Sequence, residues 1–219
     1  MGKRGPKPKG KVRIEWSSDF AYAIGLLVSD GCLSPNGRHI ILASVDREQL
    51  ENFMRALRIV VSIGKVQSPS GKGLRVQFGD VLFYAFLRDI GLMPNKSKII
   101  GAVTIPDEFF FDFLRGSFDG DGSTYAYWDK RWRSSYLFYT AFVSASRLHI
   151  DWLQERIETF LGIHGHTTSS RSRSLWQLKY AKKESLILLH RMYKNPRCIH
   201  LRRKRLKIEE MLRIVGEKL

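Results

Sequence analysis

The sequence is poor in cysteine, in acidic residues and in long apolar segments, and each shortage excludes a class of protein. Cys32 and Cys198 stand alone, without a Cys-x-x-Cys pair or a histidine at ligand spacing, which argues against a zinc site and a disulfide framework. We therefore expect an intracellular, reducing environment and no secretion. No apolar run reaches the roughly 20 residues of a bilayer-spanning helix, so no membrane partner is expected.

The N-terminal region has one feature that imitates a secretory signal peptide. A basic start is followed by an apolar stretch from Phe20 to Val28. Glu15 and Asp19 interrupt the approach to this stretch, and a related run recurs at residues 114–122, where no signal could act. We therefore expect the apolar stretch to be part of the fold.

The shortage of acids leaves a large excess of positive charge. Against 37 Lys and Arg stand 21 Asp and Glu, which gives a net charge of +16 and a pI near 10.1. This excess favours a polyanionic partner, with nucleic acid as the first candidate, and the alternative is a solvated basic surface. At 219 residues, 43% of them hydrophobic, the chain can form one domain or two small ones with a real core.

Two short segments share one pattern. Residues 23–31 read Ala-Ile-Gly-Leu-Leu-Val-Ser-Asp-Gly and residues 114–122 read Leu-Arg-Gly-Ser-Phe-Asp-Gly-Asp-Gly, so that Asp30 and Asp121 lie 91 positions apart. Small residues four positions apart share one face of a helix, over which another backbone can pass closely. We expect the glycine after each aspartate to end its helix in the left-handed conformation.

The Asp-Gly endings also predict a cation site. A carboxylate in the last turn of a helix lies beside unpaired carbonyl groups at the negative end of the helix dipole. Two such carboxylates held together repel each other unless a divalent metal or a proton lies between them, and at neutral pH we expect the metal. For a single copy an ordinary turn is the alternative, but the matching second copy argues against it.

The paired runs resemble the motifs of the LAGLIDADG homing endonucleases, in the single-chain form that carries two motifs. The second run is the closer match, because the first has Val28 and Ser29 directly before its aspartate. The resemblance implies that the two motif helices pack together at an interface between two halves. It also implies that Asp30 and Asp121 bind metal at a DNA-cutting site.

The order of elements repeats around the two runs. We predict a flexible basic arm at residues 1–13, which either lies along DNA or only aids solubility. An N-terminal half at residues 14–91, a connector at 92–106 and a C-terminal half at 107–219 follow. The apolar positions Leu50, Phe53 and Leu57 recur as Ile150, Leu153 and Ile157.

This duplication predicts an α+β fold with two pseudo-symmetric αββαββα halves packed through the motif helices. The resemblance implies that antiparallel sheets from both halves form a DNA-binding saddle over a long, asymmetric site.

Polar residues alternate with apolar ones in the second hairpin of each half, so one sheet face should be open. Arg and Lys side chains read guanine, Gln reads adenine, and all of them bind phosphate. A solvated sheet is the alternative. The side chains predicted to contact DNA are Lys65, Gln67, Arg75, Gln77, His166, Thr168, Arg171, Arg173, Gln177 and Lys179. Most aromatics between Tyr125 and Tyr139 are expected to pack in the core or sheet rather than to stack on bases.

Hydrolysis of a phosphodiester suits two carboxylates that hold Mg²⁺, with Mn²⁺ or Ca²⁺ as other possible occupants. The backbone carbonyls of Ser29 and Gly120 are candidate additional ligands. The resemblance places a basic residue near each scissile phosphate, and Lys96 and Lys204 match these positions. Lys98 is a rival for the first position, and each lysine could also be an incidental surface residue.

One further pair of residues is a candidate for positioning the attacking water. Asp46 and, at the matching place in the second half, Ser146 stand at the start of predicted helices. For Asp46 a plain helix N-cap is the alternative.

The sequence therefore predicts a site-specific, Mg²⁺-dependent endonuclease that hydrolyses one phosphodiester on each strand of double-stranded DNA and is active as a monomer. The alternatives are an RNA maturase that binds intron RNA, and a DNA-binding protein on the same scaffold that does not cut. The presence of both Asp30 and Asp121 favours the enzyme over these alternatives.

Overall fold

The computed structural model describes residues 10–66, 73–132, 134–170 and 174–219. The first half of the chain forms α1 (Ser18–Ser29), β1 (Gly31–Leu33), β2 (His39–Ser44), α2 (Arg47–Leu57), β3 (Ile63–Val66), β4 (Gly73–Gly79) and α3 (Val81–Asp89). Two short 3-10 helices follow, η1 (Lys96–Lys98) and η2 (Asp107–Phe109). The second half forms α4 (Phe110–Asp121), β5 (Ser123–Trp128), β6 (Tyr136–Ser144), α5 (Arg147–Leu161), β7 (His166–Ser170), β8 (Leu175–Tyr180), α6 (Lys182–Met192) and α7 (Arg202–Ile214).

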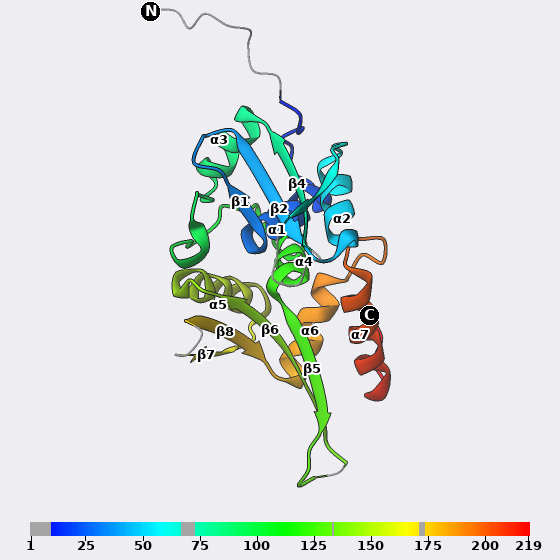
Figure 1. Ribbon diagram of the computed structural model, residues 1–219. Coiled ribbons are helices and arrows are strands. Elements are labelled where there is room, and N and C mark those ends of the chain that lie inside the picture. Colours follow the sequence, from blue (N-terminus) through cyan, green and yellow to red (C-terminus); the bar gives the residue numbers. More distant parts are fainter. Residues whose placement is uncertain (1–9, 67–72, 133, 171–173) are drawn as a thin grey trace, which may run out of the picture.

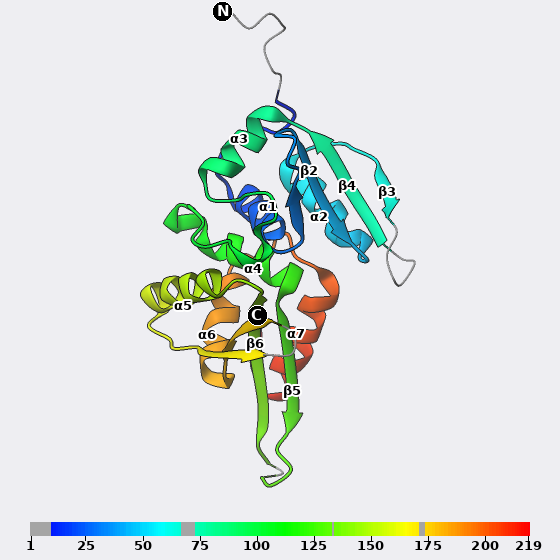
Figure 2. The ribbon, with the colours of Figure 1, turned by 60° about the vertical axis from the view of Figure 1, so that its left-hand side comes forward.

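The two halves have the same architecture, and the predicted αββαββα order is confirmed. Each half contains one four-stranded antiparallel sheet, with strand order β1-β2-β4-β3 in the first and β5-β6-β8-β7 in the second. In both views the sheets lie in opposite halves of the molecule, with α1 and α4 between them (Figures 1 and 2). The core is continuous through this central helix pair.

Glycines let the two motif helices approach closely. A Cβ atom placed on Gly25 of α1 would lie under 3.0 Å from the backbone oxygen of Phe113 and the backbone nitrogen of Ser117. A Cβ atom on Gly116 of α4 would be equally close to the carbonyl group of Tyr22. The predicted packing of the glycine-bearing helices is therefore confirmed.

The glycines that follow the two aspartates have a different role from the one expected. Gly122 has φ −75° and ψ 160°, and Gly31 is not among the described glycines with positive φ, so the predicted left-handed ending is wrong. Both are needed for space, because the chain turns back against its own helix. A Cβ atom on Gly31 would lie 2.5 Å from the oxygen of Leu27, and one on Gly122 would overlap the ring of Phe118.

The helix α7 adds to the second half an element that the repeat did not predict. Its buried side chains Ile208, Met211 and Leu212 follow helical spacing. Lys207 donates from Nζ to the backbone oxygen of Thr124 at 2.5 Å, which ties α7 to the start of β5. In Figure 2 this helix lies beside β5, and its N-terminal end lies near the motif helices. None of the helices in the described part of the chain has the length and apolar character needed to cross a membrane.

Candidate active site at the ends of the motif helices

The two predicted metal-binding acids come together at the ends of α1 and α4. Asp30 is the C-cap residue of α1, and Asp121 is the last residue of α4. A Cβ atom placed on Gly120 would lie 2.8 Å from Oδ2 of Asp30, so the Asp30 carboxylate lies over the backbone just before Asp121. The close crossing of the helices thus positions both acids in one site.

Burial disfavours the charged form of both carboxyl groups. Burial raises the pKa of Asp30 above its ordinary value. Asp121 is more exposed, but the partial enclosure of its carboxyl group, followed by the negative charge of Asp30, raises its pKa as well. A positive charge between the two carboxylates would remove this cost.

Two lysines reach the same helix ends in equivalent ways. Lys96 is buried, and its Nζ donates to the backbone oxygen of Ser29 at 3.4 Å. Lys204 donates to the oxygen of Gly120 at 3.0 Å, and to those of Phe118 and Gly122 at 2.6 and 2.7 Å. Ser29 and Gly120 are 91 positions apart, the spacing of the two acids, so the two lysines support the two helix ends in a pseudo-symmetric manner.

Burial also changes the proton affinity of both lysines. It lowers the pKa of Lys96, although the negative charges of Asp121 and Asp30 oppose the change. Burial lowers the pKa of Lys204 to about 8 against the charge of Asp119 and the two site acids. Lys98, the rival of Lys96, has an exposed side chain. The structure therefore brings together four of the predicted catalytic residues, Asp30, Asp121, Lys96 and Lys204.

Gln49 contacts the site, although the sequence analysis did not select it. Its Nε2 donates to Oδ2 of Asp30 at 2.5 Å, while its Oε1 accepts a hydrogen bond from Ser44 Oγ at 2.9 Å. Gln49 is buried on α2, so this pair of bonds fixes the orientation of the Asp30 carboxylate. In sequence, Asp46 and Gln49 match a capping box, a signal that points to the helix start and not to the site.

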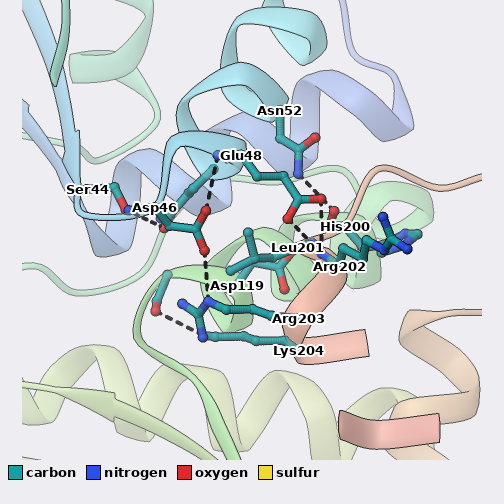
Figure 3. A network of polar contacts seen from close by, with 12 residues as sticks. Ser44, Asp46, Glu48, Asn52, Asp119, His200, Leu201, Arg202, Arg203 and Lys204 are labelled. Carbon is teal, nitrogen blue, oxygen red and sulfur yellow. Dashed lines mark hydrogen bonds and ion pairs between the residues drawn. The ribbon is translucent and has the colours of Figure 1, made fainter. Parts of the chain in front are cut away.

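The candidates for positioning water have other contacts in the described residues. Asp46 caps α2, because its Oδ1 accepts from the backbone nitrogen of Glu48 at 3.1 Å. Its Oδ2 pairs with Nε of Arg203 at 2.8 Å, as Figure 3 shows. Ser146 is buried and donates to the backbone oxygen of Ile100 at 2.5 Å. The water-positioning role of both residues stays a prediction.

The segment before α7 crosses back to the first half and holds Lys204 in place (Figure 3). Asn52 of α2 donates to the backbone oxygen of His200 at 2.8 Å. The Glu48 carboxylate accepts from the backbone nitrogen of Arg202 at 3.2 and 3.3 Å, which places a negative charge at the N-terminus of α7. These contacts fix the start of α7, two residues before Lys204.

A buried acid completes this junction. Oδ2 of Asp119 accepts hydrogen bonds from the Tyr22 hydroxyl and from the backbone nitrogen of Leu201, both at 2.7 Å. Burial raises the pKa of Asp119 to about 6, although both hydrogen bonds oppose the shift. Asp119 therefore joins α1, α4 and the start of α7, a role that the sequence pattern did not predict.

Known structures share this architecture. No protein-family model matches the chain, and no curated protein is similar to it in sequence. Among solved structures, the I-LtrWI LAGLIDADG homing endonuclease bound to target DNA has a TM-score of 0.59 and 14% sequence identity, over 91% of this chain and 90% of that one. The chain has the two-motif LAGLIDADG fold.

Two further solved structures match the chain. Full-length WhiA from Thermatoga maritima matches with a TM-score of 0.59 and 15% identity, over 94% of this chain. The chain spans 63% of the length of WhiA. I-DmoI in complex with DNA and Ca matches with a TM-score of 0.53 and 10% identity, over 81% of this chain and 90% of that one.

In this LAGLIDADG fold the first sheet places its predicted DNA contacts on two different faces. Arg75 and Gln77 of β4 are exposed on the open face, whereas Val76 and Phe78 are buried on the other. Lys65 lies opposite Leu74 in the register, so its side chain leaves the sheet on the helix-covered side. The expectation that Lys65 shares a face with Arg75 is wrong, because the pairing of β3 with β4 sets its direction.

The second sheet agrees with the prediction wherever its residues are described. His166 lies opposite Lys179, and Thr168 lies opposite Gln177, so these four side chains share the open face. The other predicted contacts, Gln67, Arg171 and Arg173, lie outside the described residues.

The residues present fit a divalent metal through the two carboxylates. Within the described part of the chain, no three or more His, Cys, Asp or Glu side chains gather into a metal cluster, so other ligands would come from water or phosphate. The predicted ligand carbonyls of Ser29 and Gly120 each accept a hydrogen bond from a lysine. A carbonyl oxygen has a second lone pair, so these bonds are compatible with a metal.

Proposed function

We propose that this chain is a divalent-metal-dependent endonuclease that cuts both strands of double-stranded DNA at a specific site. The observation that supports this most is the meeting of Asp30 and Asp121 at paired helix ends, where Lys96 and Lys204 each hold the carbonyl group that precedes one acid. Two equivalent sets of an acid and a lysine suit the two strands of a duplex. Because one chain supplies both sets, the protein would act as a monomer.

In this proposal Asp30 and Asp121 hold Mg²⁺, and Gln49 keeps the first carboxylate in its orientation. When bound, the metal supplies a Lewis acid and a water of lowered pKa. The lysines stabilise negative charge at the phosphate, and with a pKa of about 8 Lys204 is mostly protonated at neutral pH. The complex of I-DmoI with DNA and Ca, on the same fold, supports a divalent cation.

The duplex would lie across the open faces of the two sheets. Arg75 and Gln77 lie on the open face of the first sheet, and Gln177 and Lys179 lie on the open face of the second. The net charge of +16 favours the association with DNA.

A selection experiment tests the proposal. The protein is incubated with a randomised duplex library and Mg²⁺, and the cut ends are sequenced to find a preferred site. With that site in a plasmid, Asp30→Asn and Asp121→Asn should each abolish double-strand cleavage while binding, measured by gel shift, survives. The matched control is Asp151→Asn on α5, whose exposed carboxylate pairs with Arg147 and which should cut like the wild type. Double-strand cutting by the Asp30→Asn/Asp121→Asn protein would disprove the role of the acids.

One observation favours a second candidate function. Two lysines already face two acids in the site, so its charge is balanced without a metal. A protein that binds DNA without cutting it, or an RNA maturase that binds intron RNA, could therefore use the same scaffold. Enrichment of one duplex sequence by binding, with no cut ends in Mg²⁺ or Mn²⁺, would identify the first. Faster splicing of a bound intron RNA would identify the second.

A further inference from the structure

The hairpin β5–β6 is longer than its counterpart in the first half. β5 has six residues and β6 nine, whereas β1 has three and β2 six. The pairings align Ser123 and Ala141 with Cys32 and Ile41, so the residues from Tyr125 onward form an extension. This extension projects away from the rest of the second half in both ribbon views (Figures 1 and 2).

The extension presents three tyrosines on the open face of the second sheet. Tyr125 lies opposite Tyr139, and their rings stack with centroids 5.1 Å apart and planes at 23°. Tyr127 stacks on Tyr139 with centroids 6.3 Å apart, and its side chain is among the exposed large hydrophobic groups. Nζ of Lys179 lies 5.0 Å from the centre of the Tyr139 ring. The result is a row of aromatic rings with a cation beside it.

These rings are not needed for the core. Apart from the small Ala141, the buried side chains of the hairpin lie on the other face, toward the helices: Thr124, Phe138, Thr140 and Phe142. In the first half the positions that correspond to Tyr125 and Tyr139 are Ser34, beyond the end of β1, and His39, so this sheet has no matching row of tyrosines. The prediction that most of these aromatics pack in the core or sheet agrees with the structure, because Phe138 is buried and the three tyrosines stack on one another across the strands.

The charge around the rings favours a polyanion. None of the four strands β5 to β8 contains an acidic residue. At the tip of the hairpin the Asp129 carboxylate accepts hydrogen bonds from the backbone nitrogens of Arg131 and Trp132 and pairs with the Arg131 side chain. Lys130 is exposed beside it. A protein partner with an acidic or apolar surface would not need this row of flat rings, whereas nucleic acid bases match it.

We propose that the face of β5–β6 that carries Tyr125, Tyr127 and Tyr139 binds single-stranded nucleic acid by stacking unpaired bases on the rings. In a duplex the base faces are covered by neighbouring pairs, so only unpaired bases can add to such a row. Lys179 lies beside the rings, where it can contact a phosphate. This binding goes beyond cleavage of duplex DNA and does not depend on Asp30 or Asp121. Single-stranded RNA and single-stranded DNA share the chemistry.

Fluorescence anisotropy with the full chain tests the proposal. The probes are a labelled 12-mer of RNA, the same sequence as DNA, and its duplex, at one salt concentration. Replacing Tyr125 and Tyr127 by threonine keeps strand propensity but removes two rings. We expect single-strand affinity to fall about tenfold for each ring lost and duplex affinity to fall clearly less, while the circular dichroism spectrum stays unchanged. A 2-aminopurine base in the probe should be quenched by the wild type and less by this variant.

Two controls make the result specific to stacking. Tyr125→Phe/Tyr127→Phe keeps the rings and should bind like the wild type. Trp128→Thr removes an exposed ring from the same strand on the opposite face, next to Tyr136, and should also have no effect. Ring-dependent binding of either single strand supports the proposal. The probe that binds with the higher affinity shows whether the natural ligand is RNA or DNA. Unchanged affinity of the threonine variant, an equal loss in the phenylalanine variant, or an equal loss of duplex affinity would overturn it.

Discussion

Gly25 and Gly116 are counterparts in the two motif helices, and each makes room for the backbone of the opposite helix. They lie 91 positions apart, as do the two site acids. A Cβ atom on either residue would lie under 3.0 Å from the backbone of the other helix. The distance between Asp30 and Asp121 is therefore set by backbone packing at the crossing and not by side chains.

Replacing Gly116 by alanine should destabilise the fold even though alanine favours helices. The added methyl group overlaps the carbonyl group of Tyr22, which belongs to backbone and cannot turn away. We expect the free energy of unfolding to fall by about 3 kcal/mol, as measured by urea denaturation. Gly64→Ala is the matched control, because a Cβ atom there meets none of the described residues within 4 Å. Equal stability of the two variants would contradict a close crossing.

The buried His149 should make stability depend on pH. Burial lowers the pKa of His149 to about 4 from 6.5, and its Nδ1 lies 2.9 Å from the oxygen of Gly101, while Nε2 has no partner among the described residues. Since the pKa in the folded state is depressed, the contribution of His149 is complete above pH 6.5 and is lost as pH falls toward 4. The loss is about 3 kcal/mol.

His149→Asn keeps a donor for Gly101 and removes the titration. The difference in unfolding free energy between variant and wild type should therefore change between pH 6.5 and 4, in favour of the variant at low pH. The difference is the right quantity to measure, because Asp119, with a pKa raised to about 6, makes a contribution of the opposite sign. A constant difference across this range would show that His149 does not titrate in the folded protein.

The two faces of the first sheet lead to a prediction about DNA binding. Arg75 lies on the open face and Lys65 on the helix-covered side, although both are exposed. Arg75→Ala should weaken binding to the selected duplex about tenfold and reduce the salt dependence by about one phosphate contact. Lys65→Ala should cost clearly less in the same filter-binding series. Equal losses would mean that the duplex reaches both sides of the β3 edge.

The contacts of Asp46 predict a small effect on cleavage. Asn is as good an N-cap as Asp, so Asp46→Asn loses only the ion pair with Arg203, which is partly exposed and worth at most about 1 kcal/mol. Asp46→Asn and Arg203→Gln should therefore reduce the cutting rate by the same small factor. If Asp46→Asn alone abolished cutting, Asp46 would act on the attacking water, as the sequence suggested.

The features of the fold that occur in both halves could be predicted from the sequence. The spacing of Asp30 and Asp121, together with the recurring apolar positions of the helices, predicted two halves of one architecture and the packing of α1 on α4. Periodicity reports which residues are buried, and burial is nearly the same in both halves. The helix α7 has no counterpart in the first half, so a search for repeats could not find it.

Features that depend on how separate elements meet were not visible in the sequence. The direction of Lys65 follows from the register of β3 on β4, which alternation within one strand does not determine. The contact of Gln49 with Asp30 requires α2 to pack beside the end of α1. For Gly31, the sequence indicated a position that requires glycine but not the cause, because a lack of space for a Cβ atom and a positive φ both select glycine.

The segment between α6 and α7 contacts α2, and because of this contact the ends of the motif helices α1 and α4 are supported in different ways. Lys96 comes from η1, which follows directly after the first half, whereas Lys204 comes from a segment that α2 holds through Asn52 and Glu48. Loosening that segment would remove support from the end of α4 while leaving the end of α1 intact. In the proposed endonuclease, such damage would impair the cut at the end of α4 and spare the other, so the enzyme would nick a single strand. The two cuts therefore depend on different segments of the chain.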